Sequence, residues 1–445
     1  MASILKQKTK NSQGGIGMHE LTQMIYDDMK PALGVTEPGA IAFSVAKARS
    51  YTRGEITRVN VAMNSGMYKN AFTCGIPNSN EVGNVFSAAL GAVAGNADKG
   101  LESLADVTPE DNVKAQELID KGMISVELSG ITSRIFIEAT VETAEDTAVV
   151  TIRDSHTNIT KITVNGKTEL ETEDEHKTVD EDEEEAHSIH KYTLQQLYDY
   201  ITTVDIEEIR FIENAYKVNL ELFHEGLESP RTTFARHLLK LNGGKEISDD
   251  EQATASLMCN AAIEARVIGL DKPAMSITGS GAHGIIATMP LYAAYKVNGY
   301  TEEQLLRATA LSYLVCMYIK EYSGRLSAFC GCAIAAGSGM ACALVYLRGG
   351  TVEMMAHTLN NMASSITGMI CDGGNQGCTM KGIAAVDAAY KSVEFAMNGI
   401  YINDVHGING KTPEETMHNM GLIASPGMTG TEKTIVEIFE DKLKK

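Results

Sequence analysis

Hydrophobic and polar positions alternate with a period of two in several short runs in the first third of the chain. These runs cover residues 56–63, 123–128, 134–141, 148–153 and 159–164, and the Asn165-Gly166 pair after the last run is a turn signal. Helical patterns occupy 19–30, where Pro31 ends the helix, and then about 40–49, 82–96 and 109–121. The pattern predicts an α+β unit over residues 51–168.

From Tyr192 onward the pattern is helical almost throughout. The candidate helices are 193–202, 206–225, 231–241, 249–268, 285–298, 302–321, 327–347, 352–366 and 381–398, separated by Gly-rich joints. We therefore predict an α+β fold in which a small mixed α/β domain packs beside a larger all-helical domain rich in small residues. The expected domains are a flexible tail (1–17), N-terminal helices with the α+β domain (18–168), an acidic linker or loop (169–191) and a helical catalytic domain (192–445).

Residues 326–347 carry no charge for 22 residues, which is long enough to span a bilayer. The stretch consists mostly of Ala, Gly, Ser and Cys, which gain little from lipid but allow helices to pack closely. We therefore expect a buried central helix and no membrane span.

Charge and cysteine usage narrow the class of protein. The formal net charge is −20, and about half of the excess lies in residues 169–185, which hold eleven acids and one Lys. Nucleic-acid binding needs a basic face, so we expect no nucleic-acid partner. The N-terminus has no apolar core typical of a signal peptide, so we expect a cytoplasmic protein whose eight Cys are thiols or metal ligands.

Seven of the eight Cys lie between Cys259 and Cys378, inclusive. Two of them lie in a Gly-rich loop over 368–381. Cys371 and Cys378 are seven residues apart and can approach one ion, while Lys381 opens a helix whose amides favour anions. A turn with two buried Cys is the structural alternative. Cys330 precedes Cys371 by 41 residues, so a helix hairpin can return it alongside. Three thiolates and an open position suit an iron–sulfur cluster; zinc is a weaker option because paired CxxC and HExxH motifs are absent from the sequence.

Two polar segments add candidate groups. Thr278 to Gly284 brings Ser280 and His283 into a Gly-rich turn, and we expect no strand before it and hence no dinucleotide site. His156 lies in a polar break between two predicted strands, where it is either a general base or a connecting residue without a role.

Taken together, these segments resemble the iron–sulfur L-serine dehydratase alpha-chain superfamily, and most closely its L-cysteine desulfidase (UPF0597) branch. The matching segments run in order along nearly the whole chain: residues 30–34, 36–38, 69–70, 156–159, 279–281, 287–290, 326–328 and 368–373.

The resemblance implies a [4Fe–4S] cluster bound by three Cys, and conversion of L-cysteine or L-serine to pyruvate and ammonia, with sulfide released from cysteine. In the desulfidase pattern the ligands fall at the positions of Val35, Cys330 and Cys371, and Val cannot bind iron. Either Cys378 supplies the third ligand, as in the serine dehydratase branch, or no cluster forms. The chain also departs from the pattern at Ala282-His283, where Asn-Gln is typical, and at residues 77–79, where Pro-Gly-Thr becomes Pro-Asn-Ser.

The expected function is a lyase that eliminates hydrogen sulfide or water from a small L-amino acid, with no pyridoxal phosphate or nucleotide. The predicted ligands are Cys330, Cys371 and Cys378, the predicted catalytic residues are His156, His283 and Lys381, and the predicted substrate-binding residues are Thr36, Glu37, Lys69, Asn70, Ser280 and Asn375. Either histidine could be the base. The alternatives are a cluster-free lyase or isomerase acting on another small amino or hydroxy acid, and a non-catalytic thiol-rich protein that binds an amino acid. A homodimer is expected by analogy only.

Overall fold

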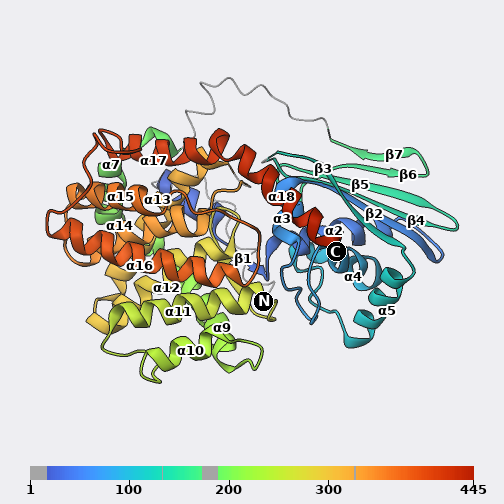
Figure 1. Ribbon diagram of the computed structural model, residues 1–445, viewed down its shortest axis with the longest axis horizontal. Coiled ribbons are helices and arrows are strands. Elements are labelled where there is room, and N and C mark those ends of the chain that lie inside the picture. The colour runs from blue at the N-terminus through green and yellow to red at the C-terminus, as the bar shows by residue number, and fades with distance from the viewer. Residues whose placement is uncertain (1–17, 133, 173–188, 325–326, 445) are drawn as a thin grey trace, which may run out of the picture.

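The computed structural model describes residues 18–132, 134–172, 189–324 and 327–444. The predicted tail over 1–17 and most of the predicted acidic linker lie outside these residues. The described part combines a six-stranded mixed sheet with a large helical region, as Figure 1 shows, which confirms the predicted α+β class.

Five of the six strands follow the predicted alternating runs closely. In chain order they are β2 (Ile56–Asn64), β3 (Ile124–Gly130), β4 (Phe136–Thr143), β5 (Thr147–Arg153), β6 (Ile159–Val164) and β7 (Lys167–Glu171). Their order across the sheet is β3-β2-β4-β5-β6-β7, with β2 and β3 parallel and every other neighbouring pair antiparallel. The last strand was not predicted; all its residues are exposed and it extends to Glu171.

Helices cover one face of this sheet. They are α2 (Thr36–Arg49), α4 (Asn84–Ala94) and α5 (Pro109–Asp120). The first two approach closely because Gly91 has no side chain: a Cβ built on it would lie 2.6 Å from the carbonyl oxygen of Ala42. Apolar positions of the central strands, such as Val61, Ala139 and Val150, are fully buried beneath these helices.

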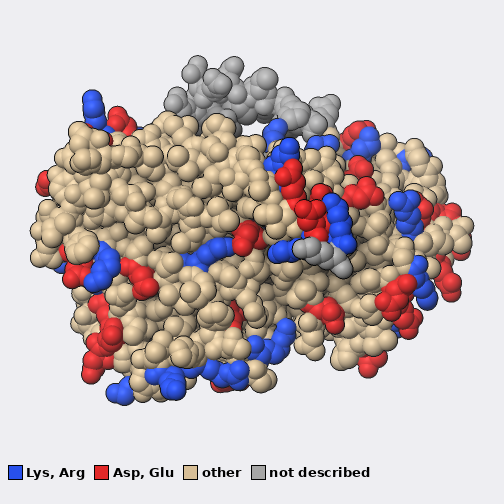
Figure 2. Space-filling model, viewed as in Figure 1, with Lys and Arg blue, Asp and Glu red and all other residues tan. Residues whose placement is uncertain are grey.

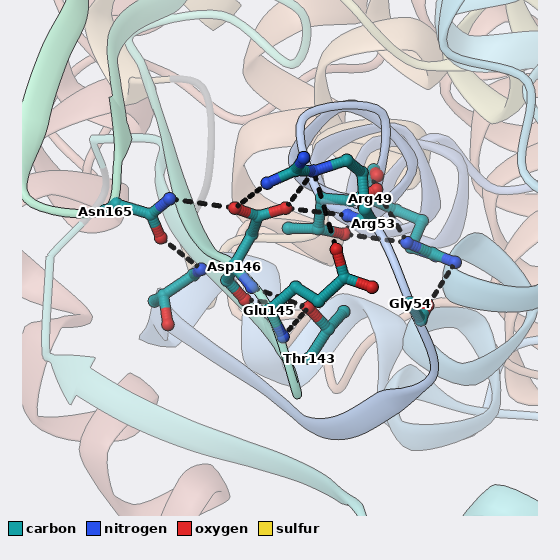
Figure 3. Close-up of polar contacts among 9 residues, drawn as sticks. Arg49, Arg53, Gly54, Thr143, Glu145, Asp146 and Asn165 are labelled. Carbon is teal, nitrogen blue, oxygen red and sulfur yellow. Dashed lines mark hydrogen bonds and ion pairs between the residues drawn. The ribbon is translucent and has the colours of Figure 1, made fainter.

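Polar contacts close the sheet end that lies far from the helical region (Figure 3). The guanidinium of Arg53, after α2, donates to Asp146 in the β4–β5 turn, with Nε 2.9 Å from Oδ2. Asn165, in the β6–β7 turn, donates to Oδ1 of Asp146 at 2.9 Å. The bonds from Arg53 and Asn165 lower the pKa of Asp146. Three connections far apart in sequence are thereby held together by one carboxylate.

The helical region contains the predicted helices and several additional ones. Its helices are α7 (Leu194–Thr203), α8 (Ile206–Ile209), α9 (Glu213–Glu228), α10 (Phe234–Leu241), α11 (Glu251–Val267), α12 (Gly281–Asn298), α13 (Glu302–Ser323), α14 (Gly337–Leu347), α15 (Val352–Ile366), α16 (Gly377–Met397), α17 (Pro413–Leu422) and α18 (Thr429–Leu443). In the described ranges, no helix combines the length and hydropathy that a bilayer span requires.

Small residues allow the central helices to pack closely, as predicted. Nearly all of α11 and α14 is buried, and a Cβ on Gly339 of α14 would lie 2.2 Å from the carbonyl oxygen of Ser312. The predicted helix over 327–347 begins later than expected. A π-helical turn spans Cys332–Ala336, and Phe329, three residues before it, lies in an isolated β-bridge. In Figure 2 the surface over α15 and α17 is largely without charge, whereas charges of both signs gather around α18 and the sheet.

Three contacts join the sheet to the helices. Strand β1 (Lys30–Leu33) pairs antiparallel with β8 (Pro273–Ser276), which immediately precedes the turn into α12. Helix α1 (Glu20–Asp28) packs against α13, and α18 returns to pack on α3 (Ser65–Ala71) (Figure 1). The predicted absence of a strand before the Thr278 turn is therefore wrong. However, β8 pairs only with β1, so the turn does not belong to a parallel βαβ unit.

Candidate functional site

Two cysteine-bearing segments lie side by side. Phe329 and Ile370 form an antiparallel bridge. On either side of it the Cys330 amide donates to the carbonyl of Met369 at 3.1 Å, and the Cys371 amide donates to that of Ala328 at 2.6 Å. The extended segment that delays the start of the α14 helix is thus what brings Cys330 next to Cys371.

Lys69 holds this junction together. Its side chain is fully buried, and its ammonium donates to the carbonyls of Ser327 (3.0 Å) and Cys371 (2.9 Å) and to Oε2 of Glu432 (2.8 Å). Burial alone would lower the pKa of Lys69, but Cys371 and Glu432 outweigh it and the pKa is raised. The ammonium of Lys69, which we predicted to bind the substrate, therefore donates three hydrogen bonds to protein groups instead.

The loop after Cys371 is held by its own polar groups. Asn375 accepts from the amide of Gly377 at 2.7 Å, which shapes the entry into α16, and Lys381 forms an ion pair with Asp372. Burial acts to lower the pKa of Lys381, but Cys378 and Asp372 raise it above its usual value. Asp372, Asn375 and Gly377 also line a cavity of about 550 Å³ between the two parts of the molecule.

Val35 lies against the same loop. It is the buried N-cap residue of α2, and a Cβ built on Gly374 would lie 2.8 Å from its Cγ1. The amide of Gly374 donates to the carbonyl of Asn70 at 3.0 Å. The position where the family resemblance places a first ligand therefore touches the loop between Cys371 and Cys378.

A chain of polar contacts leads from the sheet to Cys371. His156 lies between β5 and β6, with Nε2 3.9 Å from Oε1 of Glu37 in the first turn of α2. Glu37 Oε1 accepts from Nδ2 of Asn70 at 2.8 Å, and Asn70 Oδ1 lies 3.9 Å from the Cys371 sulfur. Helix α3 was not predicted, yet it supplies both Lys69 and Asn70. Thr36 is buried beside Glu37 at the start of α2.

His283 lies on the other side of Cys330. A Cβ on Gly331 would lie 2.7 Å from its Nε2 and 2.9 Å from Cδ of Lys320, so both side chains contact the backbone next to Cys330. Nδ1 of His283 is 2.5 Å from the hydroxyl of Thr278. Burial and the cations Lys320 and Arg266 lower the pKa of His283 to about 3, which makes the imidazole neutral and weakly basic at pH 7.

The surroundings of two of these thiols, Cys330 and Cys378, raise their pKa. A hydrogen bond with Cys332 and burial raise the pKa of Cys330 well above its usual value. Burial raises the pKa of Cys378 to about 11, and Cys371 and Cys330 contribute to the rise. Across the described residues, no three His, Cys, Asp or Glu side chains are grouped as ligands of a single ion.

Three buried charged residues around the site, Lys320, Glu432 and Arg266, were not predicted from the sequence. Glu432 is carried by α18, a helix that the pattern did not predict. Arg266 lies in α11, nearly all of which is buried. Arg266 and Glu264 are charges inside a buried helix of mostly small and apolar residues, and this was the available signal in the sequence. Glu264 accepts from the amides of Thr233, Phe234 and Ala235 at the start of α10, which accounts for its burial.

Comparison with known proteins places the chain in a family. The profile of the "Serine dehydratase alpha chain" family matches residues 98–437. A UPF0597 protein of Clostridium botulinum (strain Okra / Type B1) is 40% identical over 427 residues, covering 95% of this chain and 99% of the relative. A UPF0597 protein of Caldanaerobacter subterraneus subsp. tengcongensis is 36% identical, covering 95% of this chain and 98% of the relative. A UPF0597 protein of Clostridioides difficile (strain 630) is 32% identical, covering 94% of this chain and 99% of the relative. The chain therefore belongs to the serine dehydratase alpha chain family.

Proposed function

We propose that the protein is an amino-acid lyase that eliminates hydrogen sulfide from L-cysteine or water from L-serine, giving pyruvate and ammonia. The observation that carries the proposal is the pairing of the Cys330 and Cys371 segments, with Cys378 in the first turn of α16 just after the Cys371 loop, in a member of the serine dehydratase alpha chain family. Pyridoxal phosphate and nucleotides have no part in it.

The donor set is chemically suited to a [4Fe–4S] cluster held by Cys330, Cys371 and Cys378. Thiolates are the usual ligands of such clusters, and each binds a different iron, so they need not meet at one point. Val35 contacts the loop between Cys371 and Cys378 but offers no donor atom, which leaves one iron open in this assignment. When bound, the cluster supplies a Lewis acid that stabilises negative charge on the substrate carboxylate and the leaving group.

The residues of this chain account for the proton transfer. His156 accepts the Cα proton, and the resulting imidazolium is stabilised by the carboxylate of Glu37, 3.9 Å away. The Cα–H electron pair forms the Cα–Cβ double bond as hydrosulfide or hydroxide leaves, and the released enamine hydrolyses to pyruvate and ammonia. We assign the base to His156 over His283 because the low pKa of His283 makes it a poor proton acceptor.

Lys69, Lys381 and Asn375 position the thiol-bearing segments in this proposal. Their polar groups bind Glu432, Asp372 and the loop backbone, so they support the site from outside. Glu37 and Thr36 face the amino end of the substrate, and Ser280 faces its carboxylate.

Iron analysis tests the ligand assignment without relying on activity. Anaerobically purified protein is expected to be brown and to hold about four irons per chain. Cys378→Ala is expected to lose the iron, whereas Cys342→Ala, in the buried α14, retains it. Adding Val35→Cys to Cys378→Ala is expected to restore iron, because position 35 touches the same loop. Iron-free wild type, or unchanged iron in Cys378→Ala, would reject the assignment.

Activity tests the reaction. Wild type is expected to release sulfide and pyruvate from L-cysteine, or pyruvate from L-serine, and His156→Asn should lower kcat by about 10² to 10⁴. His357→Asn is the matched control and should keep wild-type kcat. His357 belongs to α15, and its ring stacks on that of Tyr401. Ligand binding without turnover by iron-loaded wild type would support a non-catalytic amino-acid-binding protein instead.

A further inference from the structure

One buried cation has no hydrogen-bond acceptor among the described residues. The described chain buries three Lys or Arg side chains: Lys69, Lys320 and Arg266. Lys69 is paired with Glu432, and Lys320 donates to the carbonyl of Gly324 at 2.8 Å. Arg266 is only 4% exposed, its Nε has no hydrogen-bond partner, and no ion pair or side-chain hydrogen bond joins it to any described residue. Because an uncompensated buried charge is costly, a missing negative group is indicated.

The amino end of α12 lies against this guanidinium. A Cβ on Gly281, the first residue of the 18-residue helix, would be 2.7 Å from Nε of Arg266. The amides of Gly281, Ala282 and His283 donate to no group in the described chain, and the N-cap Ser280 makes no capping bond with its side chain. Free amides at a helix N-terminus attract anions, so two independent features converge on one negative ligand.

Neighbouring residues connect Arg266 to the candidate site. Burial raises the pKa of the Cys74 thiol well above its usual value, Glu37 raises it further and Arg266 lowers it. His283, which Arg266 also influences, contacts the Gly331 backbone beside Cys330. Residues that flank Arg266 and Cys74, such as Val267 and Thr73, line the 550 Å³ cavity that also meets the Cys371 loop.

We propose that Arg266 and the N-terminus of α12 form the subsite that binds the substrate carboxylate. The fork of an arginine matches the two oxygens of a carboxylate, and Gly281 is required because any side chain there would displace the guanidinium. The single positive charge of Arg266 is balanced by a monoanionic carboxylate, and not by a dianion such as phosphate. The inference deepens the proposed lyase function and rests on it for the identity of the ligand.

Binding of L-alanine to the full chain tests the subsite separately from turnover, because L-alanine has no β leaving group. Calorimetry and the thermal midpoint are measured with L-alanine, with L-alaninamide, which lacks the carboxylate, and with inorganic phosphate. The proteins are wild type, Arg266→Gln, Arg266→Lys and the control Arg307→Gln, whose arginine already bonds to Glu303 and the carbonyl of Ile201.

Arg266→Gln is expected to bind L-alanine at least tenfold more weakly than wild type, and Arg266→Lys to recover part of the loss. L-alaninamide should bind weakly and equally to wild type and Arg266→Gln, and Arg307→Gln should keep wild-type binding of L-alanine. Without ligand, the midpoint of Arg266→Gln should equal or exceed that of wild type, because an unpaired buried charge is removed; a merely structural arginine would give a lower midpoint.

The subsite is overturned if Arg266→Gln binds L-alanine as tightly as wild type, if wild type binds no L-alanine, or if phosphate binds in its place. If Arg266→Gln misfolds, Arg266→Lys decides the test. Binding of L-alanine to Arg266→Lys as tightly as to wild type would then also reject the subsite. Binding that depends on Arg266 in a protein without lyase activity would keep the subsite and reject the proposed reaction.

Discussion

Lys69 shows how one side chain can join segments that are far apart in sequence. Its ammonium contacts residues 327, 371 and 432, which belong to the two cysteine-bearing segments and to the last helix. Glu432 is itself buried, and its Oε1 has no hydrogen-bond partner, so it depends on Lys69 for compensation of its charge. The pair therefore stabilises the site only while both members are present.

Lys69→Met is expected to lower the free energy of unfolding by about 3 to 5 kcal/mol, because it leaves the Glu432 carboxylate buried without its partner. The double variant Lys69→Met/Glu432→Leu should recover to within about 2 kcal/mol of wild type. Urea unfolding of the four proteins in this cycle measures the coupling. Additive losses in the double variant would show that the pair is not coupled.

His283 should make the stability of the fold pH-dependent. Burial beside Lys320 and Arg266 lowers its pKa to about 3 in the folded protein, whereas an unfolded histidine titrates near 6.5. The unfolded state binds the proton more readily between these values, so acidification favours unfolding. Between pH 7 and pH 5 this contributes a loss of about 2 kcal/mol. His283→Gln should remove that part of the pH dependence in urea unfolding; an identical pH profile would contradict the low pKa.

At the residue scale the sequence motifs pointed to His156, Glu37, Asn70 and Cys371, which the fold arranges in one chain of contacts. Arg266 was not predicted, because its importance lies in the lack of an acceptor around it. A sequence displays which groups are charged, but burial and pairing are properties of the packed chain.

At the scale of elements, the turn from β8 into α12 depends on glycine. A Cβ on Gly284 would lie 1.8 Å from the carbonyl oxygen of Met275, so the helix can lie on the strand only without a side chain there. The same close approach holds the amides of the α12 N-terminus beside Arg266. Displacement of this turn would therefore affect both stability and the proposed subsite.

Gly284→Ala is expected to lower the free energy of unfolding by about 3 kcal/mol or more, since backbone must move to admit the methyl group. Gly430→Ala in α18 has no atom within 4 Å of the new methyl group and should raise stability by about 0.5 to 1 kcal/mol. Thermal unfolding compares the two helical glycines. Similar effects at both positions would argue against the close packing of α12 on β8.

The elements predicted well were those with a long periodic pattern, such as β6 at 159–164 and α15 at 352–366. The four-residue strands β1 and β8 were missed because so short a run carries no period, and their pairing spans more than 200 residues. Helix α3 was missed for the same reason. The start of α14 was placed too early because local sequence cannot show that residues 327–330 pair with the loop near Cys371.

At the scale of the whole molecule, the last helix closes the site by returning across the chain. Phe439 of α18 stacks on Phe72 next to α3, with ring centroids 4.4 Å apart and an interplanar angle of 18° (the helix is red in Figure 1). Glu432 reaches Lys69 from the same helix. Docking of α18 thus supports the junction between the sheet and the helical region.

Phe439→Ala should therefore cost about 3 kcal/mol of unfolding free energy, because a buried aromatic contact is lost. Phe395→Ala is the matched control, since its ring is 46% exposed, and should change stability by less than about 0.5 kcal/mol. Urea unfolding followed by circular dichroism measures both. An equally small effect at Phe439 would show that α18 contributes little to the fold.

The sequence by itself determined the α+β class, most long helices and strands, the cysteine-rich loop and the family. These follow from periodicity and from local motifs, which are written in neighbouring residues. Only the tertiary structure decided that α3, α18 and the β1–β8 pair join the two parts, and that Lys69 and Lys381 are bound by protein groups. It alone also decided that Arg266 has no partner within the described part of the chain. The physical reason is that pairing and burial are set by contacts between residues hundreds of positions apart.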